Sequence, residues 1–460
     1  MNCSIQADLL ESKVCQQWSF ETIMSVISQQ DIYRVLDEHK AWEQRERKLN
    51  MAFMIQLVIA LAFYPTYAIE AVVREVTAGL RHQCGHGLDL PSKGALAQRR
   101  KQLGVEPMQA LFARCARPIA QPETSAAFRF GLRLVALDGT LDNVPDTPAN
   151  ATAFSHSGGA ASPSPFPQVR GVYLVECGTH VIFDAHFTDC QVGEETSAPL
   201  LLERSLKAEM LLLCDRGFFS AALFWQVRRL HAQVICRLQK GYLGERVKVL
   251  DDGSYLTWLY ADQKHHTGER MLVRVIEYTF TDPAFAGAGE TQRLVTTLLD
   301  PQCYPALQIV ETYHERWTVE TVIDEYKTHQ RLSARTLRSK TPSGIYQELY
   351  GLVLMHLAIR TLMYHSAREQ HLEPVRLSFT HAIQVLQRSV WRLALTPTAQ
   401  RACLWRDLLL ELREVRVPTP PLRFNSRVVK RVRSKYERKK PLHLHPPHLD
   451  RPFLDYVLLI

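Results

Sequence analysis

The sequence lacks several features that would assign it to a common class of protein. Its ten cysteines include no CxxC pair and follow no regular spacing, which argues against a disulfide framework or a paired-cysteine zinc module. The strongest apolar run, Met51 to Phe63, spans 13 residues and is interrupted by Gln56, whereas a membrane-spanning helix needs about 20. The first residues contain no cationic segment followed by an apolar core. We therefore expect a cytoplasmic protein with reduced thiols and no membrane partner.

Excess charge of one sign is absent except in one short segment. The chain holds 55 Lys and Arg against 47 Asp and Glu, and residues 421–440 contain nine of the cations and one of the acids. The rest of the chain is therefore balanced, and the formal charge of +8 lies in this basic segment. A concentrated cationic run usually contacts phosphates, although a solvated tail has the same composition. Within it, Lys430 and Arg431 are our candidate phosphate contacts.

A length of 460 residues allows about three domains, and 46% hydrophobic with 22% charged residues is ordinary globular composition. The changes of hydrophobic period predict an N-terminal helical domain at 1–125, the first part of a core at 126–240, a β-rich insertion at 241–299, the final part of the core at 300–345, and a helical C-terminal region at 346–460 that includes the basic segment. In that last region, the helical stretch after Ser343 predicts either a subunit contact or a helical cap within one monomer.

The N-terminal segment contains a candidate helix-turn-helix. Pro91 and Ser92 precede a short helical pattern carrying Arg99 and Arg100, and Leu103-Gly104 predicts a turn before a second helix. Such a pair can place a helix in a groove of DNA, so both arginines are candidate contacts. Any two packed helices joined by a glycine turn would have the same pattern.

The core segment alternates strands and helices. Two apolar runs, Leu132 to Leu137 and Met210 to Cys214, are typical of buried strands, and each is followed directly by an aspartate. A hairpin is predicted around Cys177 to Thr179, between these runs. This order indicates an α/β protein with one mixed sheet and helices on its faces. Asp138 and Asp215 should both lie at the carboxyl ends of strands, although a turn-forming aspartate is common there.

The sharpest local pattern lies near residue 320. If this segment is one continuous α-helix with 100° per residue, four polar side chains share one stripe, namely Tyr313, Arg316, Glu320 and Lys327. A buried stripe would be apolar, so this mixture favours a functional face. A solvated face with ion pairs is the alternative.

Three carboxylates, Asp138, Asp215 and Glu320, would together form an oxygen-ligand cluster suited to two Mg²⁺ or Mn²⁺ ions. Two such ions can activate an attacking oxygen and stabilise the leaving oxygen in phosphoryl transfer. The lack of a GxSxG or comparable signature agrees with chemistry that needs no protein nucleophile. Rival carboxylates are Asp142, Asp146 and Asp324.

These motifs resemble the DDE transposases of bacterial insertion sequences, in the group with the motif Y-(2)-R-(3)-E-(6)-K. The motif is complete in this chain from Tyr313 to Lys327. Further stretches similar to the family are ALDGT at 136–140, LLCDRGFF at 212–219, LVTTLLDP at 294–301, and LRSKTP at 337–342. Similar N-terminal helices and the VVKRVRSKY segment at 428–436 extend the resemblance over nearly the whole chain.

The resemblance implies a ribonuclease-H-like core and an enzyme that cuts DNA at the ends of its element and joins the 3′-hydroxyls to a target. It implies that Asp138, Asp215 and Glu320 bind the metal, while Tyr313, Arg316 and Lys327 contact DNA. It also makes Trp317 a candidate for stacking on a flipped base, although a core position is equally compatible with the sequence. A homodimer on two terminal inverted repeats is implied as well. A nuclease with the same core and a non-catalytic DNA-binding protein derived from a transposase are the alternatives.

Overall fold

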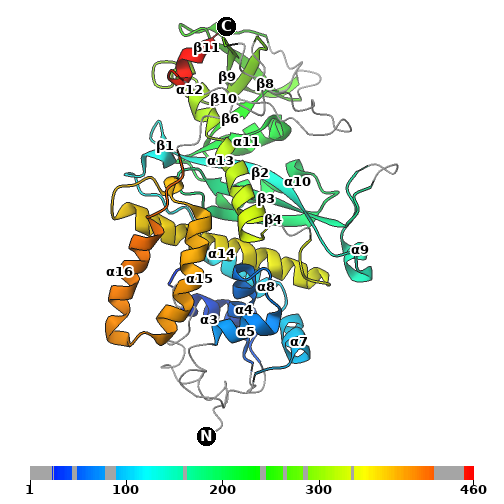
Figure 1. Cartoon of the computed structure of the whole chain (residues 1–460). Helices are drawn as coiled ribbons and strands as arrows, with labels where there is room; N and C mark the ends of the chain where they lie inside the picture. Colours follow the sequence, from blue (N-terminus) through cyan, green and yellow to red (C-terminus); the bar gives the residue numbers. More distant parts are fainter. Residues whose placement is uncertain are drawn as a thin grey trace. The chain divides into compact units, whose positions relative to one another are not determined.

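The computed structural model describes residues 23, 25–43, 49–77, 90–158, 163–238, 245–262, 267–282, 289–332, 336–418 and 450–459 (Figure 1). The basic segment with Lys430 and Arg431 lies outside these ranges. The chain folds into two compact units: the first comprises Met1–Glu123, Gly139–Gly193 and Thr321–Val417, and the second comprises Thr124–Asp138, Glu194–Glu320 and Pro418–Ile460. Each unit thus combines segments from distant parts of the sequence.

The first unit begins with the helices that the sequence predicts. They are α3 (Gln29–Glu38), α4 (Met51–Phe63), α5 (Ile69–Val76), α7 (Lys93–Leu103) and α8 (Glu106–Cys115). Three of them start at side-chain caps, because Ser28, Asn50 and Ser92 each accept a hydrogen bond from a backbone N–H in the first turn. Nearly every residue of α4 is buried, so its apolar sequence forms part of the protein core.

The C-terminal part of the first unit is also helical. It contains α14 (Pro342–Arg368), α15 (Phe379–Leu395) and α16 (Arg401–Leu412), with short 3₁₀ turns at Pro374–Arg376 and Thr398–Gln400. Most of α14 is buried and packs against α4, α8 and α16 of the same unit. This packing favours a helical cap within one monomer over a subunit contact for α14.

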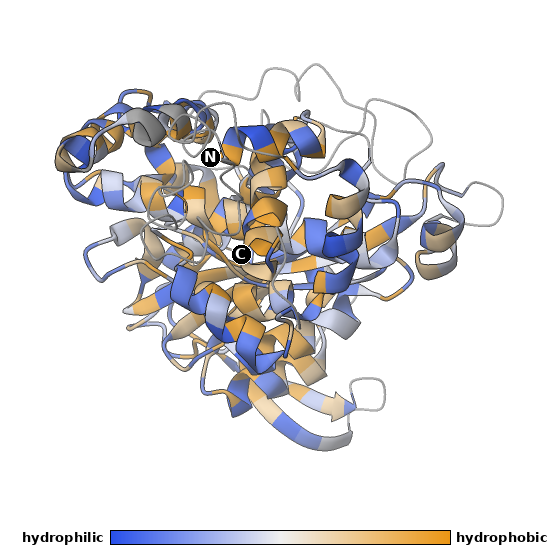
Figure 2. Ribbon diagram, turned by 90° about the horizontal axis from the view of Figure 1, so that it is seen from below, coloured by the Kyte–Doolittle hydropathy of each residue, from blue (hydrophilic) through white to orange (hydrophobic). Residues whose placement is uncertain are grey.

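Figure 2 distinguishes helices that are hydrophobic along much of their length from those in which hydrophobic and hydrophilic residues alternate. Within the described ranges, no helix combines the length and the hydropathy that crossing a membrane requires.

The first unit also contains the predicted hairpin. Strands β3 (Gln168–Glu176) and β4 (Ile182–Asp189) are antiparallel, and α9 (Pro148–Ala153) lies earlier in the chain. The turn between the strands places His180 at φ 63°, a backbone conformation that most residues avoid.

The second unit contains a mixed sheet. Its strands are β1 (Phe128–Arg129), β2 (Leu132–Asn143, whose last five residues belong to the first unit), β5 (Met210–Cys214), β6 (Gln233–Arg237), β7 (Lys248–Val249), β8 (Tyr255–Asp262), β9 (Thr267–Phe280), β10 (Gln292–Thr296) and β11 (Val457–Leu459). Strands β2, β5 and β6 are parallel neighbours, and β10 continues the sheet antiparallel to β6. The α/β class with a mixed sheet is therefore confirmed.

The helices of this unit are α10 (Glu194–Ser205), α11 (Ala221–Arg229), α12 (Ala306–His314) and α13 (Trp317–Asp324), with 3₁₀ turns at Ser125–Ala127, Arg216–Phe218 and Phe453–Tyr456. Helix α13 crosses the boundary between the units after Glu320.

The strands of the β-rich stretch at 241–299 belong to the same sheet as β5 and β6. Strands β7, β8 and β9 form antiparallel hairpins, and Gly253 takes a φ of 81° in the turn between β7 and β8. Strand β10 lies between β9 and β6 and so joins these hairpins to the rest of the sheet. Alternating hydrophobicity predicts strands correctly, but it does not indicate which neighbour each strand pairs with.

The approach of α14 to α4 generates a stability prediction. A Cβ at Gly351 would lie 2.9 Å from the carbonyl oxygen of Val58, a backbone atom that has no rotamer by which to move away. We expect Gly351→Ala to lower the free energy of unfolding by about 1–3 kcal/mol, because overpacking outweighs the gain in helix propensity. Gly94→Ala on α7 is the matched control, since nothing lies within 4 Å of its added Cβ. Equal melting temperatures for the two variants would contradict the close packing.

Candidate active site

Asp138 and Asp215 are brought together by strand register. In the parallel pair β2 and β5, Leu137 is the partner of Cys214, so the two aspartates occupy the next positions on neighbouring strands. Asp138 is 8% exposed and Asp215 is half-buried. The prediction that both lie at strand ends is correct for Asp215 and wrong for Asp138, because β2 continues to Asn143. Leu137 is the last residue of β2 that pairs with β5, so Asp138 lies at the end of this pairing and not at the end of the strand.

The segment from Tyr313 to Lys327 is not one continuous α-helix, and this part of the sequence prediction is wrong. Helix α12 ends at His314, a turn follows at Glu315 and Arg316, and α13 begins at Trp317. After Asp324, residues Glu325–Gln330 form a π-helix, labelled η5. A rotation of 100° per residue therefore does not apply along the whole motif.

Arg316 links the carboxylates of the second unit. Its Nη1 lies 3.6 Å from Oδ2 of Asp138, and its Nη2 lies 3.4 Å from Oε1 of Glu320. Burial alone would lower the pKa of Arg316, but the phenol of Tyr313 and the three carboxylates outweigh burial and raise the pKa above its usual value. The guanidinium thus stays charged and offsets the repulsion among carboxylates gathered in one place.

Tyr313 and Trp317 flank this arginine in the chain. Tyr313 is 5% exposed, and burial raises its pKa well above the usual value, which keeps its hydroxyl protonated. Trp317 is half-buried, and the guanidinium carbon of Arg316 lies 4.8 Å from the centroid of its ring. The indole is therefore in contact with the charged group and is not enclosed in the core.

Lys327 belongs to the first unit and contacts the last part of β2. Its Nζ donates hydrogen bonds to Oγ1 of Thr140 at 2.9 Å and to the carbonyl of Leu141 at 2.6 Å. The same Nζ lies 3.6 Å from Oδ1 of Asp142. About 30% of the lysine side chain is exposed, so the ammonium is anchored and still partly open to solvent.

The rival carboxylates have other roles. Asp142 is 2% exposed and pairs with Arg331 and with the hydroxyl of Tyr326, at 3.3 Å from the latter. Asp324 is exposed and accepts a hydrogen bond from Thr328 at 2.7 Å. Asp146 is exposed. Sequence reasoning had missed Asp142 as the anchor of the lysine, and no local signal indicates that role, since its partners lie more than 180 positions away.

The predicted metal ligands are Asp138, Asp215 and Glu320. Three carboxylates around one cation are the hard oxygen donors that Mg²⁺ and Mn²⁺ prefer, so the donor chemistry fits. Among the residues that the structure describes, however, no group of three or more His, Cys, Asp and Glu side chains is arranged to hold a metal ion. In the observed arrangement Arg316 provides the positive charge that lies within ion-pair distance of Asp138 and Glu320.

The two arginines of the candidate helix-turn-helix are held within the first unit. Arg99 is 7% exposed and donates two hydrogen bonds to the carbonyl of Leu49, at 3.0 and 2.7 Å. Arg100 donates to Gln347 and Ser339 and to the carbonyl of Gly344. Helices α7 and α8 and the Gly104 turn, at φ 74°, are as predicted, but these contacts give both arginines a role in holding helices together.

Comparison with known families gives two matches along the chain. Residues 17–113 match the family described as the insertion element 4 transposase N-terminal region. Residues 129–358, half of the chain, match the transposase DDE domain family. The second range contains Asp138, Asp215 and Glu320 as well as Tyr313, Arg316 and Lys327.

Individual relatives agree with these families. The transposase InsG for insertion sequence element IS4 of Escherichia coli K12 is 28% identical over 415 residues, which cover 88% of this chain and 90% of that protein. The putative transposase InsZ of the same organism is 25% identical over 180 residues, covering 39% of this chain and 58% of the relative.

Among solved structures, the piggyBac transposase in a synaptic complex with hairpin DNA is similar with a TM-score of 0.39 and 12% identity, over 89% of this chain and 88% of that one. The two family matches, together with the similarity to InsG, show that the chain belongs to the DDE transposases of the insertion element 4 type and is an enzyme of that class.

Proposed function

We propose that the protein cleaves DNA at the ends of an insertion sequence and joins the freed 3′-hydroxyls to target DNA. The observation that carries this proposal is the placement of Asp138 and Asp215 on neighbouring strands, with Glu320 drawn to the same guanidinium as Asp138. The family, which is that of transposases, supports the same reaction.

The proposed ligands of two Mg²⁺ or Mn²⁺ ions are Asp138, Asp215 and Glu320. DDE transposases generally use divalent metals, and such ions, when bound, would supply activation of the attacking oxygen and stabilisation of the leaving oxygen. Arg316 stays protonated beside these carboxylates because their charge raises its pKa. It can therefore donate hydrogen bonds to phosphate oxygens throughout the neutral pH range. Water and then a DNA 3′-hydroxyl would be the nucleophiles.

DNA is the proposed partner, both as terminal inverted repeats and as target. Tyr313 keeps its hydroxyl proton and can donate a hydrogen bond, Trp317 presents a half-buried ring, and Lys327 carries a partly exposed ammonium. These three, with Arg316, are the proposed contacts to DNA. Lys430 and Arg431 of the basic segment are proposed phosphate contacts on charge alone. We leave Arg99 and Arg100 out of the DNA contact because their donors bind groups of the protein.

A homodimer bound to two DNA ends in the cytoplasm completes the proposal. The main rival is a nuclease with the same core, which cuts without joining. A labelled donor end incubated with a target plasmid distinguishes the two, because the transposase yields a joined product and the nuclease yields only nicks. The second rival, a non-catalytic DNA-binding protein, would give neither product while still retarding the donor DNA in a gel.

The carboxylates provide the first functional prediction. Asp138→Asn, Asp215→Asn and Glu320→Gln each keep the shape of the side chain but remove the charge that binds metal. We expect each to reduce end cleavage to background while the affinity for the terminal repeat changes by less than about threefold, a small difference in binding free energy. Asp146→Asn is the control, since Asp146 is exposed and outside the proposed cluster. Wild-type cleavage by any of the three variants would contradict its assigned role.

The second functional prediction concerns Lys327. If its ammonium contacts a DNA phosphate, Lys327→Ala should weaken binding of the terminal repeat and reduce the slope of log affinity against log salt by about 1. Lys248→Ala, which changes an exposed lysine on β7, should leave that slope unchanged. Binding measured by fluorescence anisotropy at several salt concentrations gives both slopes. An unchanged slope for Lys327→Ala would remove this contact from the proposal.

A further inference from the structure

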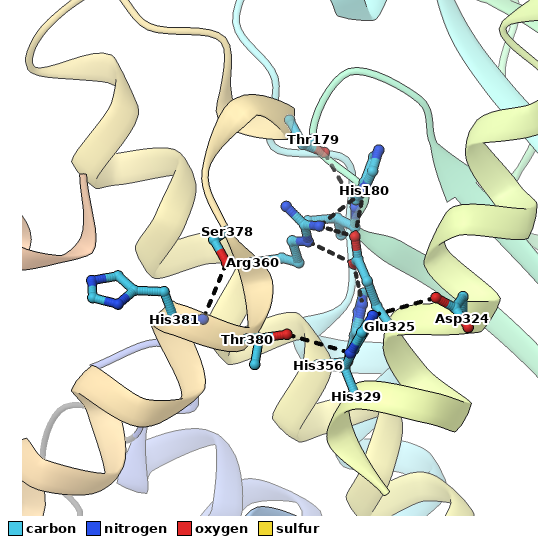
Figure 3. A network of polar contacts seen from close by, with 11 residues as sticks. Thr179, His180, Asp324, Glu325, His329, His356, Arg360, Ser378, Thr380 and His381 are labelled. Carbon is cyan, nitrogen blue, oxygen red and sulfur yellow. Dashed lines mark hydrogen bonds and ion pairs between the residues drawn. The ribbon is translucent and has the colours of Figure 1, made fainter. Parts of the chain in front are cut away.

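A buried charged cluster lies in the first unit, beside the π-helix that carries Lys327 (Figure 3). Its members are Glu325 on the π-helix, His180 in the β3–β4 turn, and His356 and Arg360 on α14. All four residues are buried, with between 0% and 7% of their surface exposed. Neither the family motif nor the proposed chemistry uses any of these four residues.

Both oxygens of Glu325 are bound within the cluster. Oε2 accepts a hydrogen bond from Nε of Arg360 at 2.9 Å and lies 3.2 Å from Nε2 of His356. Oε1 pairs with Nη2 of Arg360 and lies 2.9 Å from Nδ1 of His180. Residues of α14 thus contact both carboxylate oxygens, and His180 of the hairpin turn contacts Oε1.

The charges in the cluster are balanced. Burial would raise the pKa of Glu325, but Arg360 and the histidines outweigh it and hold the pKa well below the usual value. Burial lowers the pKa of His180 and of His356, so both are neutral at neutral pH. One carboxylate therefore faces one guanidinium, and removing either charge alone would leave the other buried without compensation.

The neighbouring residues of the π-helix bind elsewhere in the same unit. Tyr326 and Arg331 contact Asp142, Lys327 contacts Thr140 and Leu141, and Gln330 donates to the carbonyl of Leu352 on α14 at 2.9 Å. The segment is therefore fixed on one side by β2 and on the other by α14 and the hairpin turn. Glu325 is the first residue of the segment and makes its charged contacts to α14 and to the hairpin turn.

The position of Lys327 depends on the π-helical conformation. A π-helix closes its hydrogen bonds between residues i and i+5, one residue more than an α-helix. If the segment relaxed to α-helix, the side chains after the change would turn by about 100°, the rotation of one residue. The lysine would then lose its two hydrogen bonds to β2.

We propose that Glu325 is a positioning residue for the transposase reaction: with His180, His356 and Arg360 it fixes the π-helix, and the π-helix in turn places Lys327. This inference rests on the proposed function for its effect on DNA, but not for its effect on the conformation of residues 325–330. Glu325 itself touches no reacting group in this assignment.

The test compares Glu325→Gln with a matched control. Asp252→Asn in the second unit also removes the charged partner of a buried arginine, because Asp252 pairs with Arg274, which is 0% exposed. Amide hydrogen exchange of full-length protein, followed by mass spectrometry, measures protection of 325–330 without DNA. We expect Glu325→Gln to lower protection there at least tenfold, and Asp252→Asn to leave it unchanged while destabilising its own unit. Unchanged protection in Glu325→Gln would overturn the proposal.

A double-mutant cycle tests the consequence for DNA. If Glu325 acts through Lys327, cleavage by Glu325→Gln/Lys327→Ala should lie within about twofold of Lys327→Ala alone, because the second change removes nothing further. Losses that multiply would overturn positioning. If Lys327→Ala alone cleaves normally, the proposed DNA contact fails, and the exchange experiment decides positioning by itself. Should Glu325→Gln not fold, Glu325→Asp keeps the charge for Arg360, shortens the side chain by one methylene, and enters the same comparisons.

Discussion

The parallel register of β2 and β5 is the constraint on which the candidate site depends. Because Leu137 is opposite Cys214, the next residue on each strand is an aspartate, and the two carboxylates occupy adjacent positions at the point where the pairing ends. Buried apolar side chains on both strands fix this register. A slip of one residue would move both the hydrophobic pattern and one aspartate to the opposite face of the sheet.

Placing carboxylates close together, or burying one away from water, has an electrostatic cost. The fold offsets this cost with arginines. Arg316 lies within ion-pair distance of Asp138 and Glu320, and Arg360 pairs with Glu325 in the other unit. The two cases differ in exposure: Glu320 retains 19% of its side-chain surface, whereas Glu325 is almost enclosed. We assign Glu320 to metal binding, because a partly exposed carboxylate can exchange its arginine for a metal ion. We assign Glu325 to positioning, because a buried carboxylate needs an arginine that stays in place.

The sequence predicts the elements of this protein better than their connections. Apolar runs correctly predict β5 and the start of β2, and helical spacing predicts α4 and α14, because burial of these residues is a local property. The break at Arg316 and the π-helix after Asp324 are not predicted. The π-helix and the residue after it contact partners that are distant in sequence, such as Asp142, His180 and Arg360, so no local pattern indicates it. The roles of Arg99 and Arg100 were missed for the same reason. The sequence pattern of an arginine on a helix is the same whether its side chain contacts DNA or, as Arg99 does, the carbonyl of Leu49.

We propose that Asp138, Asp215 and Glu320 form one metal-binding site. Anomalous diffraction from crystals of the protein with Mn²⁺ and DNA carrying its terminal repeat tests it most directly, because the signal locates the ions independently of activity. The account predicts anomalous peaks bonded to carboxylate oxygens of all three residues, at distances of about 2.0–2.3 Å. Mn²⁺ bound elsewhere in the chain, with Asp138 and Glu320 still paired with Arg316, would contradict this assignment.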